Sequence, residues 1–165
     1  MIRDVLRYPD RRLKTPAAPI RSPGPAARRL ARDLEDTVRS YPRTVGLAAT
    51  QIGQMWRMAF VDCSGHPRAP RAAGPLWLVD PVVLHRDGAE VGREGCLSMP
   101  DITANVVRAT SIRVRHLDLD GRPRLLDAHG FEARAILHEI DHLDGILILD
   151  RVASLALDVF PRRRR

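Results

Sequence analysis

The stretch His138-Glu139-Ile140-Asp141-His142 lies in a segment, 131–144, that is predicted to form a helix ended by Gly145. Residues four apart lie on one face of a helix, so both imidazoles can bind one zinc-like metal ion. Glu139 follows the first histidine and can reach a water molecule on that ion as a general base. The stretch therefore indicates a metal-dependent hydrolase, although two surface histidines in an ordinary helix can show the same spacing by chance.

A catalytic metal site of this kind needs a third protein ligand and one open position. HExxH hydrolases usually take that ligand downstream, as a glutamate or a histidine, but neither residue type occurs after His142. Cys96 is the best upstream candidate, because a thiolate binds such ions tightly. It lies in the segment Glu-Gly-Cys-Leu-Ser at 94–98, where Gly95 would let the backbone approach the ion.

Three alternatives to this ligand set stay open. Cys96 could be a buried, inert thiol. Cys63 and His66 lie three residues apart and offer a weaker, second metal site. Downstream carboxylates could replace the thiolate, although each is better explained as a solvent-facing or turn-capping residue: Asp144, Asp150 and Asp158.

The order of the expected elements, a helix, many strands and a second helix, favours an α+β fold. An amphipathic helix is expected from Pro25 to about Pro42. An extended arm, 1–22, precedes this helix, and a surface loop is expected at 63–75. Strands are expected at 56–62, 76–84 (with Pro81 marking a sheet edge or a bulge), near 88–98, 104–108, 111–118, and within 149–160 beside a short helix. The segment Asp118-Leu119-Asp120-Gly121 predicts a hairpin turn.

The chain has 165 residues, of which 44% are hydrophobic and 28% charged, as expected for a single domain spanning 1–165. No apolar run reaches the ~18 residues of a membrane span, and the N-terminus lacks the apolar segment of a secretory signal. Two cysteines cannot build a disulfide framework, which favours a reducing compartment. We therefore expect a cytoplasmic protein with no membrane partner.

Arginine supplies nearly all of the positive charge: 27 basic against 20 acidic residues give a net charge of +7. A basic surface favours RNA or an RNA-rich assembly through long-range attraction. Only 4% of the residues are aromatic, too few for a platform that stacks single strands, and we expect no sequence-specific nucleic-acid binding. The arginines in 161–165 are expected to form a solvated basic tail, with weak contact to a polyanion as the alternative.

Three segments are together similar to the motifs of the peptide deformylase family, GxGxAAxQ, EGCxS and QHExDHLxG. This chain has the corresponding segments in the same order, at 44–51, 94–98 and 137–145. The similarity runs from Val5-Leu6-Arg7-Tyr8-Pro9-Asp10 to about Arg151. The resemblance implies small antiparallel sheets packed around a central helix that carries both histidines.

The resemblance also implies the metal chemistry of the site. It assigns three ligands of one divalent metal ion: Cys96, His138 and His142. It makes Glu139 the general acid and base. The ion is iron(II) in many cells, with zinc, nickel or cobalt as alternatives.

The remaining site residues follow from the same resemblance. The side-chain amide of Gln51 and the backbone N–H of Leu97 would polarise the formyl oxygen. The backbone of Gly46 would accept the formyl N–H. Further substrate-binding positions, including the methionine pocket beside the His138 ring, are Val45, Gly95, Phe131 and Ala135. We expect an ion pair between Glu94 and Arg108 that holds the Cys96 strand in place.

The implied reaction removes the formyl group from the N-formylmethionine of newly made polypeptides and releases formate. Nascent peptides are the expected partners, with the ribosome surface as a second candidate. Two departures from the family pattern bear on rate and substrate range: Thr44 replaces a glycine, and Leu137 replaces the glutamine before the first histidine. They leave two alternatives open, a deformylase-like paralogue with altered or reduced amidase activity and a non-enzymatic, metal-stabilised module that docks on the ribosome.

Overall fold

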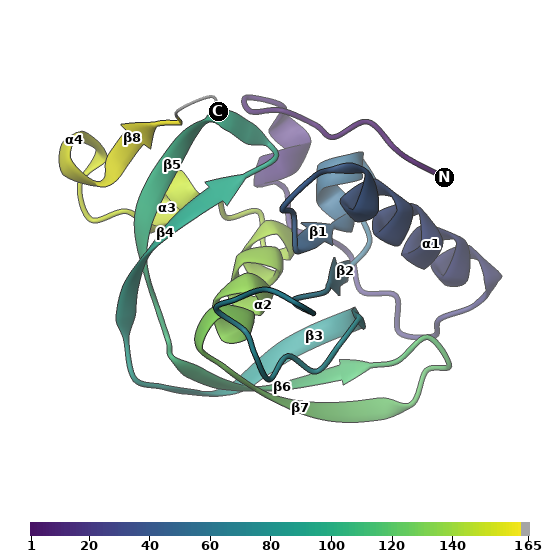
Figure 1. The fold of residues 1–165 in the computed structure, drawn as a ribbon. Coiled ribbons are helices and arrows are strands. Elements are labelled where there is room, and N and C mark those ends of the chain that lie inside the picture. Colours follow the sequence, from purple (N-terminus) through teal and green to yellow (C-terminus); the bar gives the residue numbers. More distant parts are fainter. Residues whose placement is uncertain (163–165) are drawn as a thin grey trace.

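Helix α2, Gly130–Leu143, lies between two antiparallel sheets in the computed structural model of this chain, which describes residues 1–162 (Figure 1). The larger sheet has the strand order β1 (Gly46–Ala48), β2 (Met58–Val61), β3 (Leu76–Asp87), β6 (Ser111–Leu117), β7 (Pro123–His129). The smaller sheet has the order β4 (Glu90–Cys96), β5 (Met99–Arg108), β8 (Val159–Pro161). The remaining helices are α1 (Pro25–Ser40), α3 (Ile148–Arg151), α4 (Leu155–Asp158) and two 3₁₀ turns, Arg11–Lys14 and Ala49–Ile52. This arrangement confirms the expected α+β fold.

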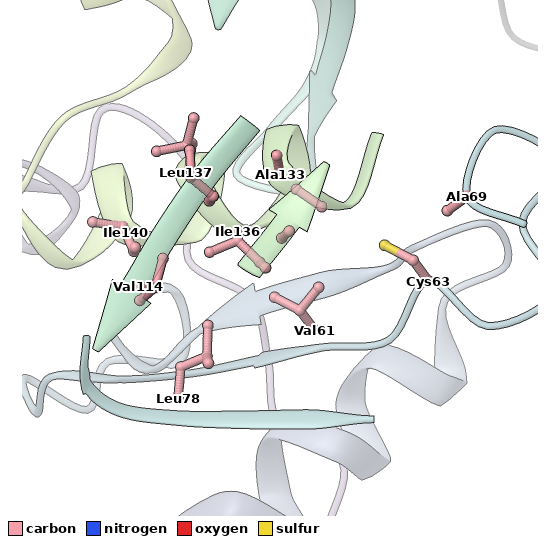
Figure 2. Close-up of a cluster of buried hydrophobic side chains, with 12 residues drawn as sticks. Val61, Cys63, Ala69, Leu78, Val114, Ala133, Ile136, Leu137 and Ile140 are labelled. Carbon is pink, nitrogen blue, oxygen red and sulfur yellow. The ribbon is translucent and has the colours of Figure 1, made fainter. Parts of the chain in front are cut away.

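The apolar face of α2 fixes the helix against the larger sheet. Ala133, Ile136, Leu137 and Ile140 follow the three-and-four spacing of one helix face, and all are buried. Figure 2 shows them in one cluster with side chains of β2, β3 and β6, namely Val61, Leu78 and Val114. Leu137 therefore packs in the core. Its departure from the family pattern therefore places an apolar side chain in the core.

Helix α1 covers the larger sheet through the predicted apolar stripe. Leu30, Leu34 and Val38 are buried against side chains of β1 and β2. Pro25 occupies the first turn of the helix, as expected. The helix ends at Ser40, close to the predicted boundary.

Strand β3 passes through Pro81 without ending, and the pairing with β6 shifts register between Val79 and Val82. The register shift confirms the bulge alternative. The sheet-edge alternative also agrees with the structure, because β2 pairs with β3 only over 76–79 and β3 has β6 as its one partner strand beyond Pro81. Asp80 takes a left-handed backbone angle, φ 49°. Its carboxylate accepts hydrogen bonds from the backbone N–H groups of Ile20 and Arg21, at 2.9 and 2.7 Å. The bulge thus anchors the N-terminal arm.

Other boundaries differ from the expectations in ways that local chemistry explains. The N-terminal arm contains a 3₁₀ turn because the Asp10 side chain accepts the N–H of Arg12. The expected hairpin turn forms at 118–121, but the strand after it, β7, was not predicted. Its outward side chains, such as Leu125, blur the alternation of apolar and polar residues. No described helix is long and apolar enough to cross a membrane.

Two residues of the expected basic tail at 161–165 lie in the described part of the chain, and both are exposed. Pro161 belongs to β8 and pairs with Ile102 of β5. The backbone N–H of Arg162 donates to the carbonyl of Asp101 at 2.8 Å. Residues 163–165 lie outside the described part of the chain.

Candidate metal centre and active site

Three ligand-type side chains meet where α2 faces the end of β4. One ligand atom from each of Cys96, His138 and His142 lies within 4.8 Å of the others. The Cys96 sulfur is 3.2 Å from Nε2 of His142. Burial disfavours the thiolate, but the two histidine rings outweigh burial and lower the pKa of Cys96 well below its usual value. The thiolate is the form that binds a metal ion, so the donor set fits one.

Glu94 orients His138. Its Oε2 lies 2.9 Å from Nδ1 of His138, which leaves Nε2 of that ring for a ligand. Burial alone would raise the pKa of Glu94, but hydrogen bonds from His138 and Arg108 lower it below its usual range. The ionised carboxylate fixes the ring and its tautomer. The expected role of Glu94, holding the Cys96 strand, therefore gains a second part that sequence reasoning missed.

The expected ion pair between Glu94 and Arg108 is confirmed. Arg108 Nε and Nη2 donate to the two oxygens of Glu94 at 2.9 and 3.0 Å, and both side chains are buried. Arg108 also pairs with Asp141 on α2, and Arg151 donates two further bonds to Asp141. The network ties β4 and β5 to the helix that carries both histidines.

Replacing Arg108 with leucine is expected to lower the free energy of unfolding by about 3–5 kcal/mol, because it leaves two buried carboxylates short of a partner. Urea denaturation followed by circular dichroism measures the change. The matched control is Arg113→Leu, which breaks an exposed pair with Asp127 and is expected to shift the transition far less. Equal shifts in both variants would contradict the structural role of Arg108.

Glu139 lies beside the three ligand-type residues with one oxygen unsatisfied. Its Oε2 is buried and has no hydrogen-bond partner within residues 1–162. Burial raises the pKa of Glu139 to about 6, although the neighbouring histidines oppose the rise. A buried carboxyl group with such a pKa can accept a proton near neutral pH and return it.

Gly46 is a glycine because Glu139 occupies the space of a side chain there. A Cβ on Gly46 would lie 2.6 Å from Oε1 of Glu139 and 3.0 Å from its Cδ. The backbone angle of Gly46 is not left-handed, so space alone requires the glycine. Packing against β1 therefore sets the position of the carboxylate.

The Gly46→Ala variant is expected to lower kcat by about 100-fold. The added methyl group displaces the Glu139 carboxylate, and a displacement of about 1 Å from the reactive position can have an effect of this size. Metal content should stay at the wild-type level, which separates this effect from loss of the ligands. Gly24→Ala is the control, since nothing lies within 4 Å of a Cβ there. Unchanged kcat in Gly46→Ala would show that the carboxylate tolerates the displacement.

A pocket of about 220 Å³ opens onto this cluster. Among the residues that line it are all the expected substrate-contacting positions: Val45, Gly46, Gln51, Gly95, Leu97, Phe131 and Ala135. Gln51 accepts the N–H of Ala48 and donates through Nε2 to Ser98 at 3.1 Å. The atoms nearest to a Cβ on Gly95 would belong to the guanidinium of Arg162, the first of them at 3.3 Å.

Four arginines also line the pocket, and none was singled out from the sequence: Arg43, Arg93, Arg134 and Arg162. The sequence could have identified Arg134 as a pocket residue, because it lies four residues before His138 and so shares the helix face of that histidine. The others come from separate segments and meet only in the folded chain. Thr44 lines the pocket too, but the left-handed residue of this loop is Arg43, at φ 64°. Thr44 itself takes no left-handed backbone angle.

The alternative ligands lie elsewhere. Asp144 pairs with Arg57 at 2.5 Å, and Asp150 pairs with Lys14 at 2.6 Å. Asp158 accepts hydrogen bonds from Asn105 and from the backbone of Ser154. Cys63 is buried in the core, while His66 stacks on the Phe131 ring at 4.0 Å. Across residues 1–162, the three-residue group of Cys96 and the two histidines is the sole cluster of this size that could hold a metal ion.

Two imidazoles and a thiolate facing one point, with a buried carboxylate beside them in a pocket, define the site of a metal-dependent hydrolase. Comparison with known proteins gives the family. The family model for polypeptide deformylase matches residues 2–157. The chain belongs to the polypeptide deformylase family.

Individual relatives agree over nearly the whole chain. A peptide deformylase of Alkalilimnicola ehrlichii is 44% identical over 154 residues, which cover 93% of this chain and 84% of that protein. The crystal structure of a peptide deformylase from Legionella pneumophila superposes with a TM-score of 0.85 at 35% identity, covering 94% of this chain and 88% of that chain. A Met-Ala-Ser-bound class I type b peptide deformylase from Acinetobacter baumannii gives a TM-score of 0.84 at 32% identity, covering 92% and 99%. The resemblance drawn from the three motifs is confirmed.

Proposed function

We propose that this chain hydrolyses the formyl group of N-formylmethionyl peptides and releases formate and a free amino terminus. The observation that carries the proposal is the position of the Glu139 carboxylate. It is buried, has one unsatisfied oxygen, and lies in the same pocket as the cluster of Cys96, His138 and His142. A relative with Met-Ala-Ser bound supports methionine as the first residue of the substrate.

The ligand set is proposed to be Cys96 Sγ with the Nε2 atoms of His138 and His142. When bound, a divalent ion supplies a Lewis acid that makes water acidic enough to react near neutral pH. A thiolate with two imidazoles suits iron(II), zinc, nickel and cobalt alike. We propose iron(II) as the ion in the cell, on family resemblance, and elemental analysis of protein purified without oxygen tests this choice.

Groups of the protein are proposed to transfer the proton, to stabilise the negative charge on the formyl oxygen and to orient the substrate. Glu139 accepts a proton from the attacking water and later gives it to the departing amine. Gln51 Nε2 and the backbone N–H of Leu97 donate to the formyl oxygen as negative charge grows on it, and loss of one such donor costs about 2.7–4 kcal/mol. The carbonyl of Gly46 accepts the formyl N–H and orients the group for attack.

The methionine side chain of the substrate is proposed to bind against the pocket wall that α2 and the segment before β1 form. Val45, Phe131 and Ala135 supply apolar surface there. The Phe131 ring stacks with the His66 ring, and the Arg68 guanidinium lies 4.8 Å from its centroid. We propose that this wall contacts the methionine side chain, with the His138 ring at one side.

Formate release tests the activity. Formyl-Met-Ala-Ser and acetyl-Met-Ala-Ser are compared with the metal-loaded protein, with formate or acetate measured enzymatically. The proposal expects rapid release of formate and negligible release of acetate. Equal turnover of both would favour the paralogue with altered amidase activity. No turnover of either would favour the non-enzymatic module, although a structural site has no need of a general base.

We also propose that the chain acts as one domain in the cytoplasm, on peptides emerging from the ribosome. The net charge of +7 supports attraction to an RNA-rich surface. Co-sedimentation with ribosomes at low and high salt tests the association, which should weaken as salt rises.

A further inference from the structure

Gly92 of strand β4 lies against the guanidinium of Arg134, one of the residues that line the pocket. A Cβ on Gly92 would lie 2.5 Å from Cζ of Arg134 and 2.8 Å from its Nε and Nη2. The backbone angle of Gly92 is not left-handed, so strand β4 itself could accept alanine there. The glycine is required because a guanidinium lies flat against it.

Arg134 is held firmly in this place. Its Nη1 donates to Oε1 of Glu94 at 2.9 Å and to the carbonyl of Val106 at 2.8 Å. Its Nη2 donates to the carbonyl of Glu90 at 2.7 Å. The residue is only 4% exposed. These bonds use three of the five guanidinium N–H groups, two on Nη1 and one on Nη2.

Arg134 is one of the residues that line the pocket proposed to hold the substrate. Arg134 lines the pocket together with Phe131, Ala135 and His138 from the same helix. One turn separates it from His138, so it lies on the helix face that carries the ligand-type residues. A fixed cationic donor therefore shares the pocket wall with the apolar side chains of Phe131 and Ala135. A buried donor favours a partner that can accept its hydrogen bond over one that cannot.

We infer that Arg134 is a specificity-determining residue of this pocket. It favours an N-formyl residue whose side chain ends in a strong hydrogen-bond acceptor over an aliphatic side chain of similar length. The sulfoxide oxygen of oxidised methionine is such an acceptor, whereas a thioether sulfur is a weak one. The inference rests on the proposed function, because it assigns the formylated residue's side chain to this wall.

The test compares kcat/KM for formyl-methionine-sulfoxide-Ala-Ser with that for formyl-norleucyl-Ala-Ser. Norleucine has the shape of methionine without the sulfur. In the wild type, the sulfoxide-to-norleucine ratio of kcat/KM should exceed one, because Arg134 donates a hydrogen bond to the sulfoxide oxygen and norleucine offers no acceptor. Arg134→Leu should lower this ratio by about tenfold or more. The ratio cancels any general loss of activity caused by disturbing Glu94.

A second variant separates recognition from loss of charge. Gly92→Ala keeps every charged group and pushes the guanidinium out of its place, so it should lower the ratio in the same direction. Arg113→Leu removes an arginine outside the pocket and should leave the ratio unchanged. If neither pocket variant folds, the wild-type ratio decides alone.

A wild-type ratio below one, or a drop of less than about tenfold in the folded variants, would overturn the inference. Formyl-Met-Ala-Ser is assayed alongside. If the wild type fails to release formate from it, the proposed function fails. If formate is released but the ratio does not respond, this inference alone fails.

Discussion

Replacing Glu139 with glutamine is expected to slow formate release by about 10²–10⁴-fold while the metal content stays at the wild-type level. Glutamine keeps the shape of the side chain but cannot accept the proton of the attacking water. The effect should be large because one carboxylate serves both proton transfers. Steady-state kinetics on formyl-Met-Ala-Ser and elemental analysis of the same sample measure the two quantities.

The matched control for this variant lies on the same helix. Glu132 is buried, and its Oε1 accepts the backbone N–H of Ala73 at 2.8 Å, a bond that glutamine can also accept. Glu132→Gln should therefore leave kcat close to the wild-type value. A Glu139→Gln enzyme that retains more than about a tenth of wild-type activity would remove Glu139 from the mechanism.

Replacing Cys96 with alanine is expected to abolish stable metal binding, and activity with it. Even the loss of a group that only supports a ligand weakens metal affinity by about 10–100-fold, so loss of the thiolate itself should exceed that range. Equilibrium dialysis against zinc or nickel measures the affinity directly.

Cys63→Ala provides the control, since Cys63 is the other cysteine and is buried in the core away from the cluster. Its metal content should match the wild type. Full metal occupancy in Cys96→Ala would mean that another group completes the site, and the upstream assignment would be wrong.

The sequence alone could predict the chemistry-bearing face of α2, because helical periodicity is local. His138 and His142 had to share a face, and the apolar residues at 133, 136, 137 and 140 had to share another. The choice of Cys96 followed from the absence of histidine and glutamate downstream, together with the motif around it. These features depend on residues near one another in the chain or on a recognisable pattern.

The features that escaped prediction depend on contacts between distant segments. Arg134 reaches Glu90 and Val106 on two different strands, and only the folded chain brings them together. The same holds for Gly46, whose missing side chain leaves room for Glu139, more than ninety positions along the chain. Arg162 begins a run of four arginines that resembles a tail, yet its backbone N–H donates to Asp101 of β5. Close packing of this kind leaves no periodic signal in a sequence.

Metal titration of formate release tests the central claim most directly. Chelator-treated protein receives increasing amounts of iron(II) or nickel without oxygen, and the initial rate of formate release from formyl-Met-Ala-Ser is followed. We expect no rate without metal, a linear rise, and a plateau at one equivalent, because Cys96, His138 and His142 form a single candidate site among the described residues. Full activity of the chelated protein, or no activity at any metal ratio, would contradict the account.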